Sequence, residues 1–299
     1  MSSKKVAIIS HDAGGAEILS SWLRRSNEDF LLSVDGPALK IFNKKIPGFK
    51  NYNLHEAIKS SDWVLCGSSF LSNLEREAIL LSKEYKKKCI VFLDHWVNYQ
   101  DRFFLDGFLC LPDEIWVGDR KAKEIAQNFF PTLSIKLKKN PYFEDVKSQV
   151  KTVRSKIGNK KYTSILYVTE PISNWAIHNH GNEHYLGYTE KTALLFFMDN
   201  THKMGFKNPI VRIKLHPSEP VGKYDEIIKK SKLNISVSKG KDLINEINKS
   251  DIVIGCNTMA LVVALLLKKR VFCSIPVSGI PHPLPFSRIK YIRDLVNAS

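Results

Sequence analysis

The sequence predicts an α/β fold made of two Rossmann-like domains that face a cleft. Two blocks of the chain repeat one order of elements: a short strand rich in β-branched residues, a polar or glycine-containing turn, and an amphipathic helix. The chain has 299 residues, 43% of them hydrophobic, which favours two ordinary cores over a single large one. A stretch rich in Lys, Ser and Asp over Asn140–Lys161 separates the blocks. We therefore expect domains over residues 1–145 and 160–299.

The first block begins with a strand over Val6–Ser10, a turn over His11–Gly15 and a helix over Ala16–Arg25. Apolar residues at helical spacing predict a helix over Ser72–Tyr85. A pure core-type run predicts a strand over Cys89–Leu93. The other elements expected in this block are strands over Phe30–Val34, Asp62–Gly67 and Glu114–Gly118 and helices over Leu54–Ser60 and Asp119–Phe129.

The second block begins with a strand over Ser164–Val168, which a long loop over Thr169–Tyr188 follows. The helix expected over Thr258–Leu267 is almost wholly apolar and should be buried. The remaining expected strands are Ile210–Leu215, Asn234–Ser238, Asp251–Gly255 and Arg270–Ser274, and the remaining helices are Thr189–Met204, Tyr224–Ser231, Leu243–Lys249 and Ser287–Val296.

The chain is strongly basic, with 45 Lys and Arg against 30 Asp and Glu and a formal net charge of +15. This excess favours anionic partners, namely nucleic acid, an acidic membrane face or phosphorylated substrates. The cations lie in short clusters that flank expected strands or end expected helices, where Lys is a common solvated residue. No nucleic-acid-binding module is present and the aromatic residues are not interleaved with these clusters, so we expect no nucleic-acid partner. A non-catalytic protein that binds a polyanion remains an alternative.

The cysteine pattern indicates a reducing compartment. The five cysteines form no CxxC pair and several lie in apolar runs, which is typical of reduced thiols in a cytoplasmic protein and argues against a cysteine-bound metal. No signal-peptide pattern precedes the first strand, and the longest apolar stretch, Val253–Leu267, is too short to span a bilayer. Any membrane contact should therefore be peripheral, at an anionic inner membrane face.

Polar groups follow two strands of the first block. After the first strand, His11 and Asp12 stand where a general base would lie, and Gly14 and Gly15 allow the backbone to approach a ligand closely. The alternative is that Asp12 caps the helix and the glycines only form the turn.

After the fourth strand, Asp94 and His95 are a second pair of candidates for binding or catalysis. Arg102 is a candidate anion contact, and Trp96, Tyr99 and Phe103 are a candidate ligand-binding wall. The alternative is a structural loop with a satisfied histidine.

The strongest signal is His216-Pro217-Ser218-Glu219, directly after an apolar strand. Proline fixes the backbone after the histidine, so the imidazole is held at the sheet edge, where it can donate a hydrogen bond to a phosphate oxygen.

Two further loops of the second block carry candidate ligand-binding groups. Asn257 and Thr258 begin the apolar helix, which suits phosphate binding, and the alternative is simple N-capping. Glu170 can accept hydrogen bonds from a ribose or base, and the alternative is a solvated carboxylate. Three histidines of the long loop, His178, His180 and His184, resemble a zinc site only in composition, so no metal is expected.

On these residues the second block resembles the donor half of bacterial surface-polysaccharide transferases. The segments Arg212–Glu219 and Ser250–Pro276 are most similar to sialyltransferases and polysialyltransferases, and more distantly to teichoic-acid glycerophosphotransferases. These families carry a His-Pro motif that contacts the donor phosphate, which His216-Pro217 matches, and a Ser/Thr pair at a following helix start, which Asn257-Thr258 half matches. They also place an acidic residue before a glycine in the N-terminal half as the catalytic base. Asp12-Ala13-Gly14 is the nearest match, and the usual second acidic residue is absent.

The resemblance implies a GT-B-type, metal-independent, inverting glycosyltransferase. A sugar, of the sialic-acid type by this resemblance, would move from a nucleotide-activated donor, with CMP favoured, to a surface glycan or glycolipid, and no further cofactor would be needed. Asp12, or else His11, Asp94 or His95, would deprotonate the acceptor hydroxyl, and His216 would stabilise the departing phosphate. The alternatives are a nucleotide-sugar 2-epimerase of the same fold and a degenerate transferase that acts only as an assembly partner.

Overall fold

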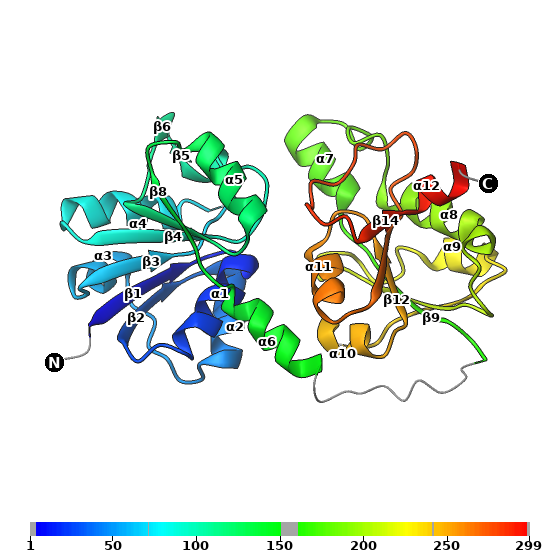
Figure 1. The fold of residues 1–299 in the computed structure, drawn as a ribbon, viewed down its shortest axis with the longest axis horizontal. Coiled ribbons are helices and arrows are strands. Elements are labelled where there is room, and N and C mark those ends of the chain that lie inside the picture. Colours follow the sequence, from blue (N-terminus) through cyan, green and yellow to red (C-terminus); the bar gives the residue numbers. More distant parts are fainter. Residues whose placement is uncertain (1–3, 71, 151–160, 241, 298–299) are drawn as a thin grey trace. The chain divides into compact units, whose positions relative to one another are not determined.

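A computed structural model of the chain describes residues 4–70, 72–150, 161–240 and 242–297. The chain divides into two compact units, Met1–Asp145 and Val146–Ser299 (Figure 1). Within the described residues, each unit contains one six-stranded sheet in which all neighbouring strands are parallel. The predicted α/β class with two Rossmann-like domains is therefore confirmed. Residues 151–160 of the expected junction lie outside the described residues.

The sheet of the N-terminal unit has the strand order β2-β1-β3-β4-β7-β8. Its strands are β1 (Lys5–Ser10), β2 (Asp29–Val34), β3 (Trp63–Cys66), β4 (Lys88–Leu93), β7 (Glu114–Val117) and β8 (Ser134–Leu137). Its helices are α1 (Ala13–Leu23), α2 (Gly36–Lys45), α3 (Leu54–Lys59), α4 (Leu74–Glu84), α5 (Arg120–Phe129) and α6 (Pro141–Val150), which continues past Asp145. A short 3-10 turn, η1 (Asp101–Phe103), leads into a hairpin of β5 (Phe104–Leu105) and β6 (Phe108–Leu109).

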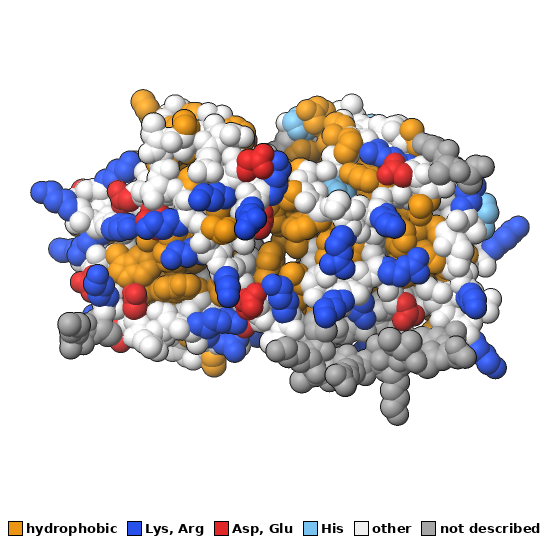
Figure 2. Space-filling view, viewed as in Figure 1, with side chains coloured by type: hydrophobic (Ala, Val, Ile, Leu, Met, Phe, Trp, Pro, Cys, Tyr) orange, Lys and Arg blue, Asp and Glu red, His pale blue; other side chains and the backbone are white. Residues whose placement is uncertain are grey.

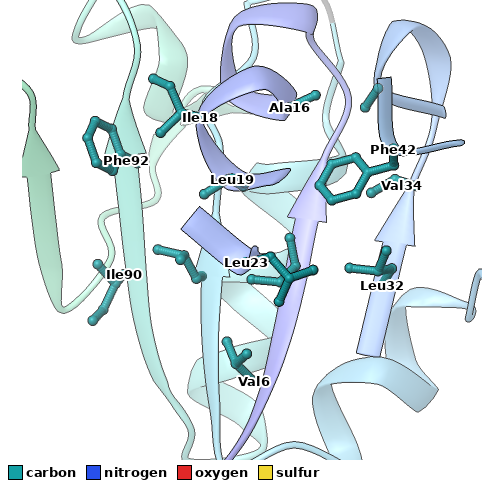
Figure 3. Close-up of a cluster of buried hydrophobic side chains, with 13 residues drawn as sticks. Val6, Ala16, Ile18, Leu19, Leu23, Leu32, Val34, Phe42, Ile90 and Phe92 are labelled. Atoms are coloured by element: carbon teal, nitrogen blue, oxygen red, sulfur yellow. The ribbon is translucent and has the colours of Figure 1, made fainter. Parts of the chain in front are cut away.

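The core of this unit follows from the alternation of side chains along the strands. In β1, Val6 and Ile8 belong to one buried cluster, while Ala7 and Ile9 are buried on the opposite face. Leu19 of α1 packs into the same cluster as Val6, together with residues of β2, β4 and α2 (Figure 3). Because both faces are covered, the strands read as continuous apolar runs, which is typical of a parallel sheet.

The C-terminal unit has the strand order β11-β10-β9-β12-β13-β14. Its strands are β9 (Ser164–Val168), β10 (Ile210–Lys214), β11 (Asn234–Val237), β12 (Ile252–Gly255), β13 (Arg270–Cys273) and β14 (Ile289–Tyr291). Its helices are α7 (Ile172–His180), α8 (Glu190–Asn200), α9 (Asp225–Lys230), α10 (Leu243–Asn248), α11 (Met259–Leu266) and α12 (Ile292–Asn297), with a 3-10 turn η2 (Thr201–Met204) after α8. The expected burial of the apolar helix is confirmed, since Ala260–Leu265 of α11 are all buried.

The direction in which the chain adds strands reverses once in each sheet, between β1 and β3 and between β9 and β12. Loops at the carboxyl ends of the strands that flank such a reversal diverge to opposite faces of the sheet and leave a crevice, where α/β proteins bind ligands. These two reversal points are therefore where functional side chains are expected.

Several elements differ from the sequence-based expectation. The expected long loop after β9 contains α7, whose ends are marked by Pro171 and by Gly181 at φ 69°, two residue types that also mark loops. Helix α2 begins at Gly36-Pro37, where proline is tolerated because the first N–H groups of a helix need no partner. Strands β8 and β14 and helix α6 were not expected. No helix within the described ranges is both long and apolar enough to cross a bilayer.

Candidate functional site

A hydrogen-bonded imidazole–carboxylate pair lies at the carboxyl end of β1. His11 Nδ1 is 2.7 Å from Asp12 Oδ1, and the two side chains are 21% and 24% exposed. Asp12 stands at the N-cap position of α1 but makes no side-chain cap bond, and its Oδ2 instead accepts from the Phe70 N–H at 3.3 Å. The pair is therefore accessible to a ligand and is held in place by the loop after β3.

The buried carboxyl group of Glu75, on α4, supports this pair through the backbone of His11. Its Oε1 accepts the backbone N–H of His11 at 2.8 Å, while its Oε2 is buried without a hydrogen-bond partner. Burial raises the pKa of Glu75 to about 7, and the N–H donors of His11 and of Glu75 itself oppose that rise. Sequence reasoning missed Glu75. The signal lay in its spacing from Ala78, Ile79 and Ser82, the buried face of α4.

The two glycines that follow the pair lie in the first turn of α1 instead of in a loop. A Cβ at Gly14 would stand 1.8 Å from Asp94 Oδ2, and a Cβ at Gly15 would stand 3.1 Å from the Cα of Gly67. Gly14 and Gly15 therefore allow the loops after β3 and β4 to pack closely against α1. We had predicted that these glycines let a ligand approach the backbone, and the structure shows that they serve packing inside the protein.

Asp94, at the end of β4, is held by an internal clamp. Its Oδ1 accepts from Arg102 Nη1 at 2.9 Å and from Ser68 Oγ at 3.0 Å. The same Arg102 nitrogen also donates to the Ser68 oxygens, so the predicted anion contact is used by the protein itself. Asp94 thus joins the loops after β3 and β4.

The structure does not show the aromatic wall predicted beside Asp94, because Trp96, Tyr99 and Phe103 are buried. Burial lowers the pKa of His95, with a further contribution from Arg102 that Asp94 opposes, and the buried His95 Nδ1 has no partner. The recess beside His95 measures about 10 Å³, which is room for one water at most.

In the C-terminal unit, the exposed side chain of His216 follows β10. Its backbone N–H donates to Thr169 Oγ1 at 3.1 Å and to Glu219 Oε2 at 3.0 Å, which fixes the start of the loop. The Ser218 N–H donates to His216 Nδ1 at 3.3 Å, and Ser218 Oγ lies 2.7 Å from the same nitrogen. Since Nδ1 accepts from this N–H, the neutral ring carries its proton on Nε2. Desolvation lowers the pKa of His216, and Glu219 opposes this. The exposed Pro217 follows directly.

Glu219 organises this loop from inside. Its side chain is 0% exposed and accepts hydrogen bonds from Thr169 Oγ1, from Tyr224 OH at 2.7 Å and from Lys223 Nζ at 2.9 Å. Burial alone would raise the pKa of Glu219, but these donors and the His216 N–H outweigh it and hold the pKa below its ordinary value. Glu219 therefore lies beneath the surface and holds the backbone of His216 in place, and a direct contact of Glu219 with a ligand stays a prediction.

The loops after β9 and β12 meet at the second reversal point. The Asn257 N–H donates to the Glu170 carboxyl group, yet Glu170 Oε1 and Asn257 Oδ1 are both buried without a partner. Burial raises the pKa of Glu170 to about 8, which leaves the group largely uncharged at neutral pH. Thr258 caps α11 by accepting from the Ala260 N–H at 3.3 Å, as the N-capping alternative predicted.

The histidines considered as a zinc site lie on α7 and in the segment after it. His178 and His180 are on α7, and the His180 ring stacks on Tyr185 with a centroid distance of 3.5 Å. Across the part of the chain that the structure describes, no group of three or more His, Cys, Asp and Glu side chains could hold a metal ion.

The structure thus brings the predicted residues together within each unit. His11, Asp12 and Asp94 gather around the first reversal point, with His95 beside them, and Glu75 joins them from α4. Glu170, Asn257 and Thr258 gather at the second, and Thr169 links them to the His216 loop. Among these groups, Glu170 Oε1 and Asn257 Oδ1 are buried without a hydrogen-bond partner within the described residues.

Comparisons with known proteins were made on sequence and on structure. No protein-family model matches the chain, and no curated protein matches it in sequence. Among solved structures, the UDP-GlcNAc 2-epimerase from Methanocaldococcus jannaschii is similar with a TM-score of 0.64 and 14% identity, over 98% of this chain and 91% of that chain.

Two other solved structures are similar at the same level. A putative UDP-N-acetylglucosamine 2-epimerase from Listeria monocytogenes has a TM-score of 0.60 and 15% identity, over 91% of this chain and 79% of that chain. The glycotransferase of kitacinnamycin has a TM-score of 0.56 and 10% identity, over 100% of this chain and 90% of that chain. At these identities the likeness shows the fold, which is of the GT-B type with two Rossmann-like domains.

Proposed function

We propose that this chain is a metal-independent, inverting glycosyltransferase that uses a nucleotide-activated sugar. The observation that carries the proposal is the His216 loop, in which Ser218 occupies Nδ1 and leaves an Nε2–H donor on an exposed ring. A neutral imidazole fixed in this way at the end of a parallel strand can donate to a phosphate oxygen as negative charge develops on it. The similarity in fold to a UDP-GlcNAc 2-epimerase and to a putative UDP-N-acetylglucosamine 2-epimerase supports the same substrate class.

The C-terminal unit would hold the donor. Glu170 and Asn257 each offer a buried oxygen without an internal partner, and a protonated Glu170 can both donate to and accept from a ribose or base. Thr258 and the start of α11 lie at the same reversal point and suit a phosphate group. A CMP-linked, sialic-acid-like donor is the finer form of this proposal.

The N-terminal unit would supply the base. The His11–Asp12 pair accepts the proton of the acceptor hydroxyl while the hydroxyl oxygen attacks the anomeric carbon. The new C–O bond forms on the face opposite the leaving group, and the bond to the nucleotide phosphate breaks with its electron pair on the phosphate oxygen. The acceptor is a surface glycan or glycolipid, and the enzyme acts in the cytoplasm with peripheral contact to the inner membrane.

A nucleotide-sugar 2-epimerase is the second candidate, because two of the similar solved structures carry that name. The same residues would serve it, with His11–Asp12 or Asp94 removing the proton from the sugar C2. This reaction needs no acceptor, whereas the transferase reaction does.

The donor half is tested by calorimetry with CMP, CDP, UDP and GDP. We expect one nucleotide to bind, and His216→Gln to weaken it about tenfold or more, because a charge-assisted hydrogen bond to phosphate is lost. His202→Gln, which alters an exposed histidine on η2, is the matched control. If no nucleotide binds, or if His216→Gln binds as tightly as the control, the proposal fails.

The reaction is tested with a panel of nucleotide sugars in D₂O, analysed by mass spectrometry with and without glycan acceptors. Nucleotide release that depends on an acceptor supports the transferase, and deuterium gained by the sugar without an acceptor supports the epimerase. Asp12→Asn should lower turnover while nucleotide binding stays, and Asp106→Asn on the hairpin is the control. Nucleotide binding without any turnover would identify a degenerate, non-catalytic protein.

A further inference from the structure

A basic pocket lies at the amino ends of the strands of the C-terminal sheet, away from the loops at the reversal point. It has a volume of about 460 Å³, and it is formed where α11 turns into the amino end of β13 and where β14 begins. Glu170, His216 and Asn257 follow the carboxyl ends of parallel strands of the same sheet, on its opposite side. The pocket is therefore separate from the proposed donor site.

All charged side chains that line this pocket are positive. Its lining includes Lys203, Lys268, Lys269, Arg270, Arg288 and Lys290, and no carboxylate. No described carboxylate forms an ion pair with Lys203, Lys268, Arg270, Arg288 or Lys290. Cations gathered in this way repel one another, and an anion with several oxygens relieves that repulsion. On the face that Figure 2 shows, Lys and Arg side chains are spread over both units.

Two aromatic contacts hold one cation of the pocket, Arg270, in place. The Arg270 guanidinium lies 5.7 Å from the ring centroid of Phe206 and 5.6 Å from that of Phe272. A guanidinium held against rings keeps its N–H edge free for bidentate hydrogen bonds to a phosphate group. The backbone of Lys268 has a φ of 58°, in the left-handed region that non-glycine residues adopt rarely, in the turn before Arg270.

The pocket also has an apolar component. Met204, Leu265, Val271, Phe272 and Leu295 line it beside the cations. An apolar lining suits a ligand with a carbon skeleton next to its phosphate. It does not suit the bare backbone of a nucleic-acid duplex, which needs an extended stripe of cations. The volume lies within the usual range of small-ligand sites, about 300–1,000 Å³.

We propose that this pocket is a second site, which binds the phosphate group of an anionic ligand independently of the proposed donor site. The phosphate belongs either to a lipid headgroup or to a soluble phosphorylated molecule, and both present the same chemistry to Arg270 and the lysines.

The test uses the full chain and two probes. Inorganic pyrophosphate is titrated by calorimetry, and vesicles of phosphatidylglycerol and phosphatidylcholine are tested by co-sedimentation. The test variant is Lys268→Gln/Arg288→Gln/Lys290→Gln, and the matched control is Lys40→Gln/Lys59→Gln/Lys83→Gln, which removes the same charge from exposed positions of the N-terminal unit. Circular dichroism confirms that both variants fold.

We expect at least one probe to bind the wild-type chain, the pocket variant to bind it about tenfold more weakly or worse, and the control to change it by less than about twofold. Loss of vesicle binding alone identifies a lipid headgroup, and loss of pyrophosphate binding alone identifies a soluble ligand. Binding that survives in the pocket variant but disappears in His216→Gln shows that the ion uses only the donor site, and this overturns the proposal. Failure of both probes to bind overturns it as well.

Discussion

At the scale of single residues, each unit has a buried carboxyl group with a raised pKa near its reversal point, Glu75 in the N-terminal unit and Glu170 in the C-terminal unit. Burial raises the pKa of Glu75 to about 7 and that of Glu170 to about 8. Both groups have one buried oxygen without an internal partner. A buried carboxyl group whose pKa lies near neutrality can exchange a proton or hydrogen-bond a polar ligand near neutral pH.

The raised pKa of Glu75 makes the stability of the fold depend on pH. The folded chain holds this proton more tightly than the unfolded chain, whose carboxyl groups have a pKa of 4.5. The stabilisation is fully present below that pH and is lost as the pH rises through about 7. We expect Glu75→Gln to reduce the fall in the free energy of unfolding between pH 5 and pH 8 by on the order of 2 kcal/mol.

Urea denaturation at pH 5, 6, 7 and 8 measures this effect. Glu77→Gln, which changes an exposed carboxyl group on the same helix, should retain the wild-type pH dependence. An identical fall in Glu75→Gln and wild type would contradict the assignment, and Glu170→Gln reports the corresponding effect in the C-terminal unit.

The contact between Gly14 and Asp94 gives a second prediction. An added methyl group at Gly14 would overlap Asp94 Oδ2, so Gly14→Ala must displace Asp94 from Arg102. We expect a destabilisation of about 1–3 kcal/mol from this overpacking. In an Asp94→Ala background the same substitution should cost much less. Thermal denaturation of the four chains in this double-mutant cycle measures the coupling, and additive effects would count against the contact.

At the scale of elements, one buried polar network ties together the loops of the C-terminal unit. Lys223 bridges Glu219 and Glu190, and the Glu190 carboxylate in turn accepts from the Ser173 N–H at the start of α7, at 2.8 Å. Through Thr169 and the His216 N–H, this network fixes the ends of β9 and β10 relative to α7 and α8. The exposed His216 ring is therefore supported by an internal network of buried polar groups.

Glu219→Gln tests this network. The substitution removes one of the two carboxylates that neutralise Lys223 and one acceptor oxygen shared by Thr169 and His216. We expect a loss of about 2–4 kcal/mol in the free energy of unfolding, because buried donors are left without partners. Glu226→Gln, at an exposed position of α9, should change it by less than about 0.5 kcal/mol. Equal stability of the two variants would show that the network contributes little.

At the scale of the whole molecule, each unit has its own apolar core, and all five cysteines are buried in the two units as free thiols. Burial raises the pKa of the Cys66, Cys256 and Cys273 thiols. Protonated, inaccessible thiols react slowly with disulfide reagents.

We expect the native chain to react with Ellman's reagent no faster than it unfolds. The full set of five thiols should appear on addition of urea. The reaction is followed by absorbance at several urea concentrations, alongside circular dichroism. A thiol that reacts within seconds in the absence of urea would show that one of these sites opens locally.

Local patterns in the sequence determined the class of the fold and most of its elements. The alternation of apolar strands and amphipathic helices predicted two parallel sheets, because burial on both faces of a strand leaves a continuous apolar run. The same patterns placed His11, Asp12, His216 and Asn257 at strand ends. They could not identify α2 or α7, whose Gly and Pro residues mark helix ends as well as loops.

Only the tertiary structure decided which strand ends meet. Glu75 touches His11 across 64 positions of the chain, and Thr169 meets Glu219 across 50, because β1 pairs with β3 and β9 with β10. Burial of Glu219, Trp96 and Arg102 likewise depends on what packs over them. Periodicity records which face of an element is apolar. The partner of a polar group is fixed by strand order and loop packing, and these join residues far apart in the sequence.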